Sequence, residues 1–226
     1  MMTTTNPTAG AAAMREAMVS SQLRTTGVDD LRVIGAMATV AREDFVPAAA
    51  GALAYRDATV SLGRGRFLNT PLATARLINE AGILAEDRVL LIGAATGYAA
   101  ALVARLGARV TAVEEDGELL ATARVALAAT DLGGGTVELV EGPLAAGQAA
   151  GAPYDVLLID GAVEELPDAL VAQLRVDGRI ATGLVDRGVT RLATGRRTEG
   201  GAGTMAFTDA ECVVLPGFAR APAFRF

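Results

Sequence analysis

The sequence predicts an α/β fold with a mostly parallel central sheet, and three observations carry this prediction. Short apolar runs recur along the chain, as is typical of strands that are buried on both faces. Segments of helical length, rich in alanine and leucine, separate these runs. A complete unit of strand, glycine-bearing turn, helix and strand occupies residues 89–115. Such alternation places helices on the two faces of a parallel sheet.

Residues 89–115 also predict a site for a nucleoside-containing cofactor. The expected elements are a strand at 89–92, a helix at 98–106 closed by Gly107, and a second strand at 110–113. The turn between Gly93 and Gly97 is expected to present free backbone N–H groups at a helix N-terminus. Glu114, at the tip of the second strand, can accept hydrogen bonds from a ribose diol.

The region before this unit is expected to be helical and then irregular. Helices are predicted at residues 14–23 and 29–38, the second capped by Asp29 or Asp30. Residues 51–71 are glycine-rich and irregular, and Pro71 opens a helix at 72–81. Two alternatives are open for the irregular loop: it covers a bound cofactor, or it only connects two packed layers.

After Glu114 the alternation of helices and strands continues. The expected elements are helices at 118–129 and 167–174, strands at 137–140, 156–159 and 179–185, and an antiparallel hairpin of 204–207 with 212–215. Ligands of open α/β sheets bind beyond the carboxyl ends of the strands. The site is therefore expected near Gly93, Glu114, Gly142 and Asp160.

Composition favours one domain without disulfides. The chain has 226 residues, of which 51% are hydrophobic, and its one cysteine, Cys212, is expected to be a small buried residue. The expected layout is a disordered tail at 1–10 and a single domain at 11–226, with a helical cap (11–58), an active-site loop (59–71) and a Rossmann-like core (72–226).

Charge and targeting signals narrow the partners and the location. The net charge is −6, and all 20 basic residues are arginines without a dense basic run, which argues against nucleic acid or an anionic membrane as a main partner. No apolar stretch approaches the ~20 residues of a membrane span, and the N-terminal residues do not have the pattern of a secretory signal. A cytoplasmic location is expected. The sequence leaves the oligomeric state open and slightly favours a monomer.

The absence of histidine excludes several kinds of enzyme. Ser-His-Asp and Cys-His hydrolases, and zinc sites built on His and Cys, cannot be assembled from this chain, and no metal is expected. None of the three serines lies in a G-x-S-x-G motif. Methyl transfer to a carboxylate remains possible, because a carboxylic acid with a pKa of about 4 is ionised at neutral pH and needs no general base.

The chain resembles the protein-L-isoaspartate O-methyltransferase family from about residue 14 to about residue 190. The N-terminal positions that carry the resemblance are Arg15, Met18, Val19, Gln22, Leu23, Gly27, Val28, Val33, Ala36, Met37, Arg42, Phe45, Val46, Pro47, Ala54, Tyr55, Asp57, Gly63, Gly65 and Pro71. The later ones are Gly93, Gly97, Tyr98, Val113, Glu114, Ala152, Pro153, Tyr154, Asp155, Glu165, Leu166 and Pro167. The resemblance is specific, because the N-terminal signature and the cofactor motif occur in the family's order.

The resemblance implies a class I methyltransferase fold, S-adenosylmethionine as cofactor, and methylation of isoaspartyl carboxylates in damaged proteins or peptides, as a step of protein repair. It places Gly93 and Gly97 near the amino-acid part of the cofactor and Glu114 on its ribose. The full expected cofactor set is Gly93, Ala95, Gly97, Glu114, Glu115, Gly142, Pro143 and Asp160. Asn69 and Thr70 would orient the acceptor carboxylate, within a substrate loop that includes Leu68 and Pro71.

Several family positions are not kept. Leu91 replaces an acidic residue, Ala95 a glycine, Pro143 the Asp of a G-D-G motif and Asn69 a serine. Two lost hydrogen bonds to charged groups, at roughly 1.5 kcal/mol or more each, weaken cofactor binding by at least about a hundredfold unless other groups substitute. We therefore expect slower methylation than in members that keep these groups.

Two hypotheses stay open at this point. The chain is either a divergent O-methyltransferase, or an impaired family member that serves as a binding or regulatory module with weak or no cofactor binding. A nicotinamide-dependent oxidoreductase is a more distant alternative, because the turn G-A-A-T-G does not have the G-x-G-x-x-G fingerprint.

Overall fold

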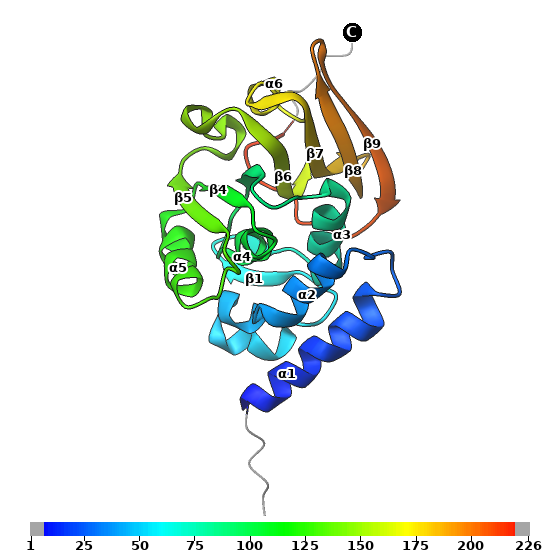
Figure 1. The fold of residues 1–226 in the computed structure, drawn as a ribbon. Coiled ribbons are helices and arrows are strands. Elements are labelled where there is room, and N and C mark those ends of the chain that lie inside the picture. Colours follow the sequence, from blue (N-terminus) through cyan, green and yellow to red (C-terminus); the bar gives the residue numbers. More distant parts are fainter. Residues whose placement is uncertain (1–6, 220–226) are drawn as a thin grey trace, which may run out of the picture.

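A seven-stranded sheet organises the computed structural model, which describes residues 7–219 (Figure 1). Its strands are β3 (Arg88–Ile92), β4 (Arg109–Glu114), β5 (Thr136–Glu141), β6 (Tyr154–Val163), β7 (Leu174–Asp186), β8 (Val189–Thr198) and β9 (Gly201–Asp209). They lie in the order β5-β4-β3-β6-β7-β8-β9. The strands from β5 to β7 are parallel, whereas β8 and β9 are antiparallel to their neighbours. The predicted α/β fold with a mostly parallel sheet is confirmed.

The helices occur where the sequence pattern places them, with shifted ends. The α-helices are α1 (Pro7–Met18), α2 (Leu31–Thr39), α3 (Pro71–Ala81), α4 (Tyr98–Arg105), α5 (Gly117–Ala128) and α6 (Asp168–Val171). The shorter helical turns are η1 (Val19–Leu23), η2 (Arg42–Phe45), η3 (Ala48–Leu53), η4 (Leu144–Ala146) and η5 (Ala149–Gly151). Helix α6 is shorter than the predicted helix at 167–174, because the chain enters β7 at Leu174.

Polar side chains fix the starts of two N-terminal helices. Asp30, rather than Asp29, caps α2 by accepting a hydrogen bond from the backbone N–H of Arg32. Thr70 caps α3 through the N–H of Ala73, and Pro71 occupies the first helical position, where its missing N–H has no cost. Residues 7–10 of the tail expected at 1–10 are helical, because α1 begins at Pro7; residues 1–6 lie outside the described part.

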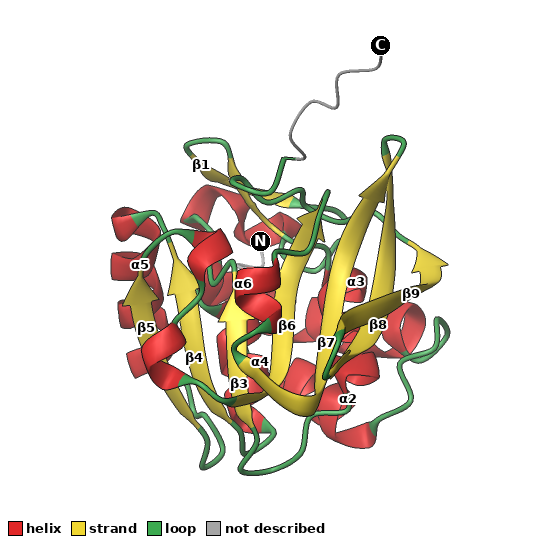
Figure 2. Cartoon of the chain, turned by 90° about the horizontal axis from the view of Figure 1, so that it is seen from above, coloured by secondary structure: helices red, strands yellow, loops and turns green. Residues whose placement is uncertain are grey.

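The segment expected to be an irregular loop contains a small hairpin. Strands β1 (Val60–Gly63) and β2 (Arg66–Leu68) pair in antiparallel orientation and form a separate two-stranded sheet. Arg64 and Gly65 make the turn between them with positive φ angles. Figure 2 shows β1 beyond the end of the main sheet toward which the arrows of the parallel strands point.

The predicted C-terminal hairpin has a different partner strand. Residues 204–207 belong to β9 as expected, but β9 pairs with β8 and not with residues 212–215. Residues 212–215 instead run beside β6, with one parallel bridge between Ala162 and Val214. Strand β8 escaped sequence analysis because three arginines interrupt its apolar pattern.

The core consists of two hydrophobic clusters, one on each face of the sheet. Along β3, Val89 and Leu91 belong to the cluster that contains residues of α2, α3, α4 and α5. Leu90 and Ile92 belong to the other, which contains residues of α6 and of the C-terminal end of the described chain. The last four residues of β3 are buried between β4 and β6, so the turn that follows them is flanked by paired strands on both sides.

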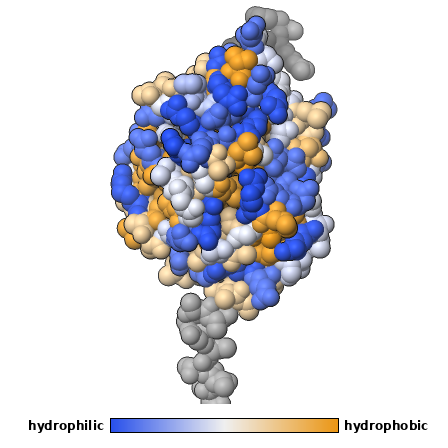
Figure 3. All heavy atoms as spheres, viewed as in Figure 1, coloured by the Kyte–Doolittle hydropathy of each residue, from blue (hydrophilic) through white to orange (hydrophobic). Residues whose placement is uncertain are grey.

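No helix among the described residues is long and apolar enough to cross a membrane. On the face shown in Figure 3, hydrophobic residues are scattered among hydrophilic ones and do not form one broad patch. Scattered apolar residues are normal on the surface of a folded protein.

Two glycines test the packing of this fold. A Cβ built on Gly135 would lie 2.0 Å from the backbone oxygen of Ala104, whereas a Cβ on Gly35 in α2 would meet nothing within 4 Å. We expect Gly135→Ala to lower the free energy of unfolding by about 1–3 kcal/mol. Gly35→Ala should raise it by about 0.5–1 kcal/mol, because alanine loses less backbone entropy in a helix. Urea unfolding checks both, and equal effects of the two changes would contradict the described packing.

Candidate functional site

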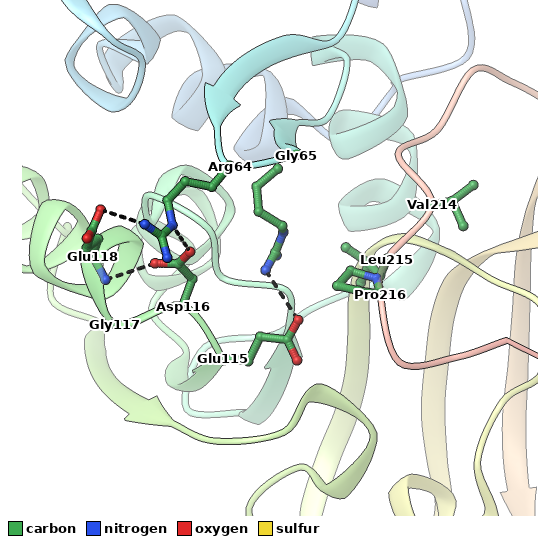
Figure 4. Close-up of a pocket in the computed structure, with 10 residues that line it drawn as sticks. Arg64, Gly65, Glu115, Asp116, Gly117, Glu118, Val214, Leu215 and Pro216 are labelled. Carbon is green, nitrogen blue, oxygen red and sulfur yellow. Dashed lines mark hydrogen bonds and ion pairs between the residues drawn. The ribbon is translucent and has the colours of Figure 1, made fainter.

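A cavity of about 740 Å³ opens beyond the carboxyl ends of β3 and β4. Three segments line it: the β1–β2 turn, the turn from β4 into α5, and the C-terminal segment, by which we mean residues 212–218. The lining residues are Arg64, Gly65, Arg66, Glu115, Asp116, Gly117, Glu118, Val214, Leu215 and Pro216. Figure 4 shows that Leu215 and Pro216 lie across the cavity from the charged side chains of the two turns. The cavity thus occupies the place predicted for a ligand in an α/β sheet.

Glu114 ends β4 at this cavity, but its carboxylate is already fully engaged. The side chain is completely buried. Oε2 accepts hydrogen bonds from the Ala95 N–H at 2.8 Å and from Arg66 Nη2 at 2.8 Å. Oε1 accepts from Arg66 Nη1 and from the backbone N–H groups of Glu115 and Asp116. The residue expected to hold a ribose diol therefore lies in the expected place with an internal partner, Arg66.

A second arginine attaches the β1–β2 turn to the start of α5. Arg64 Nε lies 2.8 Å from Asp116 Oδ2, and Arg64 Nη1 lies 3.3 Å from Glu118 Oε2 (Figure 4). The hydrogen bond from Arg64, with those from the backbone N–H groups of α5, keeps the pKa of Asp116 below its usual value. Asp116 is also the N-cap of α5. These contacts hold the β1–β2 turn over the cavity.

Most N–H groups of the glycine turn after β3, which the sequence predicted to be free, are hydrogen-bonded within the protein. The N–H groups of Gly93 and Ala94 both donate to the carbonyl oxygen of Val113, at 3.1 Å, and that of Gly97 donates to Ala94. With the bond from Ala95 to Glu114, four N–H groups of the turn are paired inside the protein. Ala95 has a φ of 48°, a left-handed conformation that costs a residue with a Cβ about 1–2 kcal/mol.

Leu215 packs directly on this turn. A Cβ built on Gly93 would lie 2.9 Å from Leu215 Cδ1, and one built on Gly161 would lie 2.5 Å from Leu215 Cγ. The leucine side chain is 5% exposed. The space over Gly93, where the family resemblance implies the amino-acid part of the cofactor, is filled by a side chain of the same molecule. Gly97, by contrast, faces Leu127 and Ala123 of α5 and serves helix packing.

Asn69 and Asp160 lie together, in a buried cluster beside the cavity and not in its lining. Asn69 Nδ2 donates to Asp160 Oδ1 at 3.1 Å, and Thr74 Oγ1 donates to the same oxygen at 2.8 Å. Asn69 Oδ1 accepts from the N–H of Val213 at 3.1 Å. Burial raises the pKa of Asp160, against the lowering effect of these hydrogen bonds and of the Arg42 charge. Asp160 therefore makes structural contacts in place of the predicted cofactor contacts.

The other residues of the predicted substrate loop are also buried and engaged. Leu68 is 2% exposed, and Thr70 and Pro71 begin α3. Cys212 is buried as expected, and its Sγ lies 3.4 Å from Asn69 Nδ2. Burial raises the pKa of the Cys212 thiol to about 12, so it is not ionised at neutral pH and is not a nucleophile.

Of the predicted cofactor residues, Glu115 lines the cavity directly. Gly142 donates its N–H to the carbonyl oxygen of Glu114, and Pro143 is exposed before η4. Leu91 is fully buried in the core, so an acidic side chain there would enter apolar surroundings.

Sequence analysis missed Arg64, Arg66, Asp116 and Leu215. Asp116 had a recognisable signal, as an N-cap residue before a helix, whereas nothing in the sequence linked Leu215 to Gly93.

The buried carboxylate of Asp160 generates a prediction about pH. Because its pKa is raised in the folded state, its contribution to stability is fully present below the unfolded pKa of about 3.9 and is lost as the pH rises through the folded pKa. Asp160→Asn should therefore become more stable relative to the wild type as the pH rises from about 4 to about 8. Urea unfolding across this range checks the prediction.

Asp155 provides a control of opposite sign. Burial alone would raise its pKa, but hydrogen bonds from the Arg88 N–H and from Arg175 hold the pKa below its usual value. Its contribution is present above the unfolded pKa and is lost as the pH falls through the folded pKa. Asp155→Asn should therefore lose stability relative to the wild type as the pH rises toward about 4, and the difference should stay constant from about 5 to about 8. If the difference in free energy of unfolding between Asp160→Asn and the wild type does not change with pH, the prediction that burial raises the pKa of Asp160 is wrong.

Comparison with known proteins gives these features a context. The family model described as protein-L-isoaspartate(D-aspartate) O-methyltransferase matches residues 13–212. Protein-L-isoaspartate O-methyltransferase 1 of Rhodopseudomonas palustris (strain HaA2) is 38% identical over 188 residues, which cover 83% of this chain and 76% of the relative. The protein-L-isoaspartate O-methyltransferase of Koribacter versatilis is 40% identical over 171 residues, 76% of each chain.

Solved structures of the same name share the fold. One protein-L-isoaspartate O-methyltransferase superimposes with a TM-score of 0.76 at 23% identity, covering 90% of this chain and 66% of its own length. A β-aspartate methyltransferase of Plasmodium falciparum, solved with S-adenosyl-L-homocysteine, gives 0.75 at 17% identity over 91% of this chain and 97% of that one. At these identities the structures show the fold, while the sequence matches show the family. The chain belongs to the protein-L-isoaspartate O-methyltransferase family.

Proposed function

We propose that the protein is an S-adenosylmethionine-dependent O-methyltransferase that acts on isoaspartyl carboxylates of damaged proteins or peptides. The observation that carries the proposal is the placement of Glu114. In a chain that is about 40% identical to relatives of this name, it ends β4 beside a cavity of about 740 Å³. That volume lies within the range of sites for small molecules and cofactors.

The residues at the two ends of the cavity fit the cofactor differently. Glu115 and Asp116 offer carboxylate oxygens on the open side, and these can accept hydrogen bonds from the hydroxyl and amino groups of an adenosine. At the other end, Leu215 covers the Gly93 turn, so the amino-acid part fits only when this side chain moves. S-adenosylmethionine supplies an electrophilic methyl group; this chain's residues bind it, orient the acceptor and exclude water.

The proposed chemistry suits a chain without histidine. The acceptor is a carboxylate that is already ionised at neutral pH, so rate enhancement comes from holding acceptor and methyl group in line. We propose that Asn69 and Thr70 position the acceptor through the loop to which they belong, because their side chains are 1% and 3% exposed and already hydrogen-bonded. The proposal includes protein, and not nucleic acid, as the acceptor, and the cytoplasm as the location; the net charge of −6 supports the former.

A pair of peptides tests the proposed activity. An isoaspartyl peptide should accept a methyl group from labelled S-adenosylmethionine as a base-labile ester, while the matched aspartyl peptide should not. We expect turnover below about 1 per second, because the family's serine, second glycine and acidic adenine partner are replaced. Measurement of label volatile after base treatment gives the rate. Equal labelling of both peptides, or labelling of neither at stoichiometric protein, would contradict the proposal.

Removal of the Glu114 carboxylate tests the proposed cofactor site. Glu114→Gln should weaken binding of S-adenosylhomocysteine by about tenfold or more, because a charged acceptor for the ribose is lost. Glu138→Gln, the same change on the exposed face of the neighbouring strand β5, is the matched control and should leave binding unchanged. Titration calorimetry measures affinity, and thermal unfolding confirms that both variants are folded. Unchanged binding in folded Glu114→Gln would place the cofactor elsewhere.

A further inference from the structure

We propose that the C-terminal segment, residues 212–218, is a strap that closes the cofactor site, so that the cofactor binds only after Leu215 leaves the Gly93 turn. This inference rests on the proposed function and adds a regulatory step to the same site. Four features of the structure carry it: the position of Leu215, the attachment of the strap, its contact with Asn69 and the pairing of Glu114.

The position of Leu215 makes the strap and the cofactor mutually exclusive. Its side chain lies so close to Gly93 and Gly161 that a Cβ on either glycine would approach it within 3 Å. It belongs to the core cluster that includes Ile92 and Phe218. Two atoms cannot share this space, so a ligand on the Gly93 turn must displace the leucine.

Two backbone hydrogen bonds attach the strap to β6. Ala162 donates its N–H to Val213 at 2.6 Å, and the N–H of Leu215 donates to Ala162 at 2.9 Å. The chain pairs with β6 in a single bridge and not as a full strand, next to an irregularity in the register of β6 with β7. Every third residue of the strap, Cys212, Leu215 and Phe218, is buried, whereas Val214 is 55% exposed. A segment with so few ladder bonds can leave without breaking the main sheet.

Asn69 connects the strap to the substrate loop. Its Oδ1 accepts from Val213 N–H, while its Nδ2 donates to Asp160 and its carbonyl oxygen accepts from Arg42. Movement of the strap therefore frees Asn69 Oδ1, and Asn69 lies two residues before the start of α3. Cofactor entry and acceptor positioning are coupled through this side chain, which acts here as a latch.

The pairing of Glu114 closes the other part of the site. Arg66 holds the carboxylate with both Nη atoms and is itself 7% exposed. Arg66 and Leu215 line the same cavity, so one ligand would meet both. In the closed state Arg66 therefore pairs with the Glu114 carboxylate, and Leu215 covers the Gly93 turn.

Substitution of the strap leucine tests the proposal by affinity. Leu215→Ala should bind S-adenosylhomocysteine about tenfold more tightly than the wild type, because a larger fraction of molecules has an open site. Asn69→Ala, which removes the latch without touching the Gly93 contact, should change affinity in the same direction. Leu84→Ala, the same chemical change at a half-exposed leucine outside the cavity, is the control and should bind as the wild type does.

Amide hydrogen exchange provides a readout that does not depend on activity. In the wild type, saturating S-adenosylhomocysteine should speed exchange of the Leu215 and Ala162 amides, whose hydrogen bonds hold the strap. Equal affinity of wild type and Leu215→Ala, with these amides still protected in the complex, would overturn the strap while leaving the proposed function intact. If neither binds although exchange shows an open strap in Leu215→Ala, the strap is not the barrier and the proposal also falls. Peptide methylation then decides the proposed function separately.

Discussion

The buried ion pair between Arg66 and Glu114 holds the site together. Glu114 links the end of β4 to the Ala95 N–H of the glycine turn, and Arg66 ties both to the β1–β2 hairpin. Removal of one partner from a buried pair typically costs 3–5 kcal/mol, about the cost of leaving the other charge unpaired. The position of the hairpin over the cavity, and with it the shape of the site, therefore depends on this contact. It also explains how the Glu114 carboxylate can be fully buried.

Positioning, and not proton transfer, is the chemistry that such a site can perform. The titratable groups buried beside the cavity already have internal contacts: burial raises the pKa of the Cys212 thiol, and the Asp160 carboxylate accepts two hydrogen bonds. Both belong to the cluster that fixes the start of α3. A reaction whose acceptor is already ionised needs only such a rigid frame and a dry approach path. The loss of histidine is compatible with this kind of catalysis.

Local signals predicted most of the fold, whereas contacts between distant segments escaped prediction. The unit from β3 to β4 was predicted to within one residue at each end of its elements, because periodicity and glycines are read over a few positions. The contacts that define the site join residues far apart, with 48 positions between Arg66 and Glu114 and 144 between Asn69 and Val213. The pairing of β8 with β9 was missed for a local reason, because the arginines of β8 interrupt its strand pattern. Four N–H groups of the glycine turn are paired because Val113, Ala94 and Glu114 supply acceptors that periodicity does not reveal.

The closed strap also changes how the departures from the family are interpreted. We expect the replacements at Ala95 and Pro143 to weaken cofactor binding, and a closed state lowers the apparent affinity further, by the fraction of open molecules. These two effects differ physically: the first is intrinsic to the site, whereas the second disappears when something binds the strap. A ligand shifts such an equilibrium only through different affinities for the open and closed states. Because Asn69 belongs to both the latch and the substrate loop, an acceptor protein that engages this loop can favour the open state, and the cofactor would then bind best when a substrate is present.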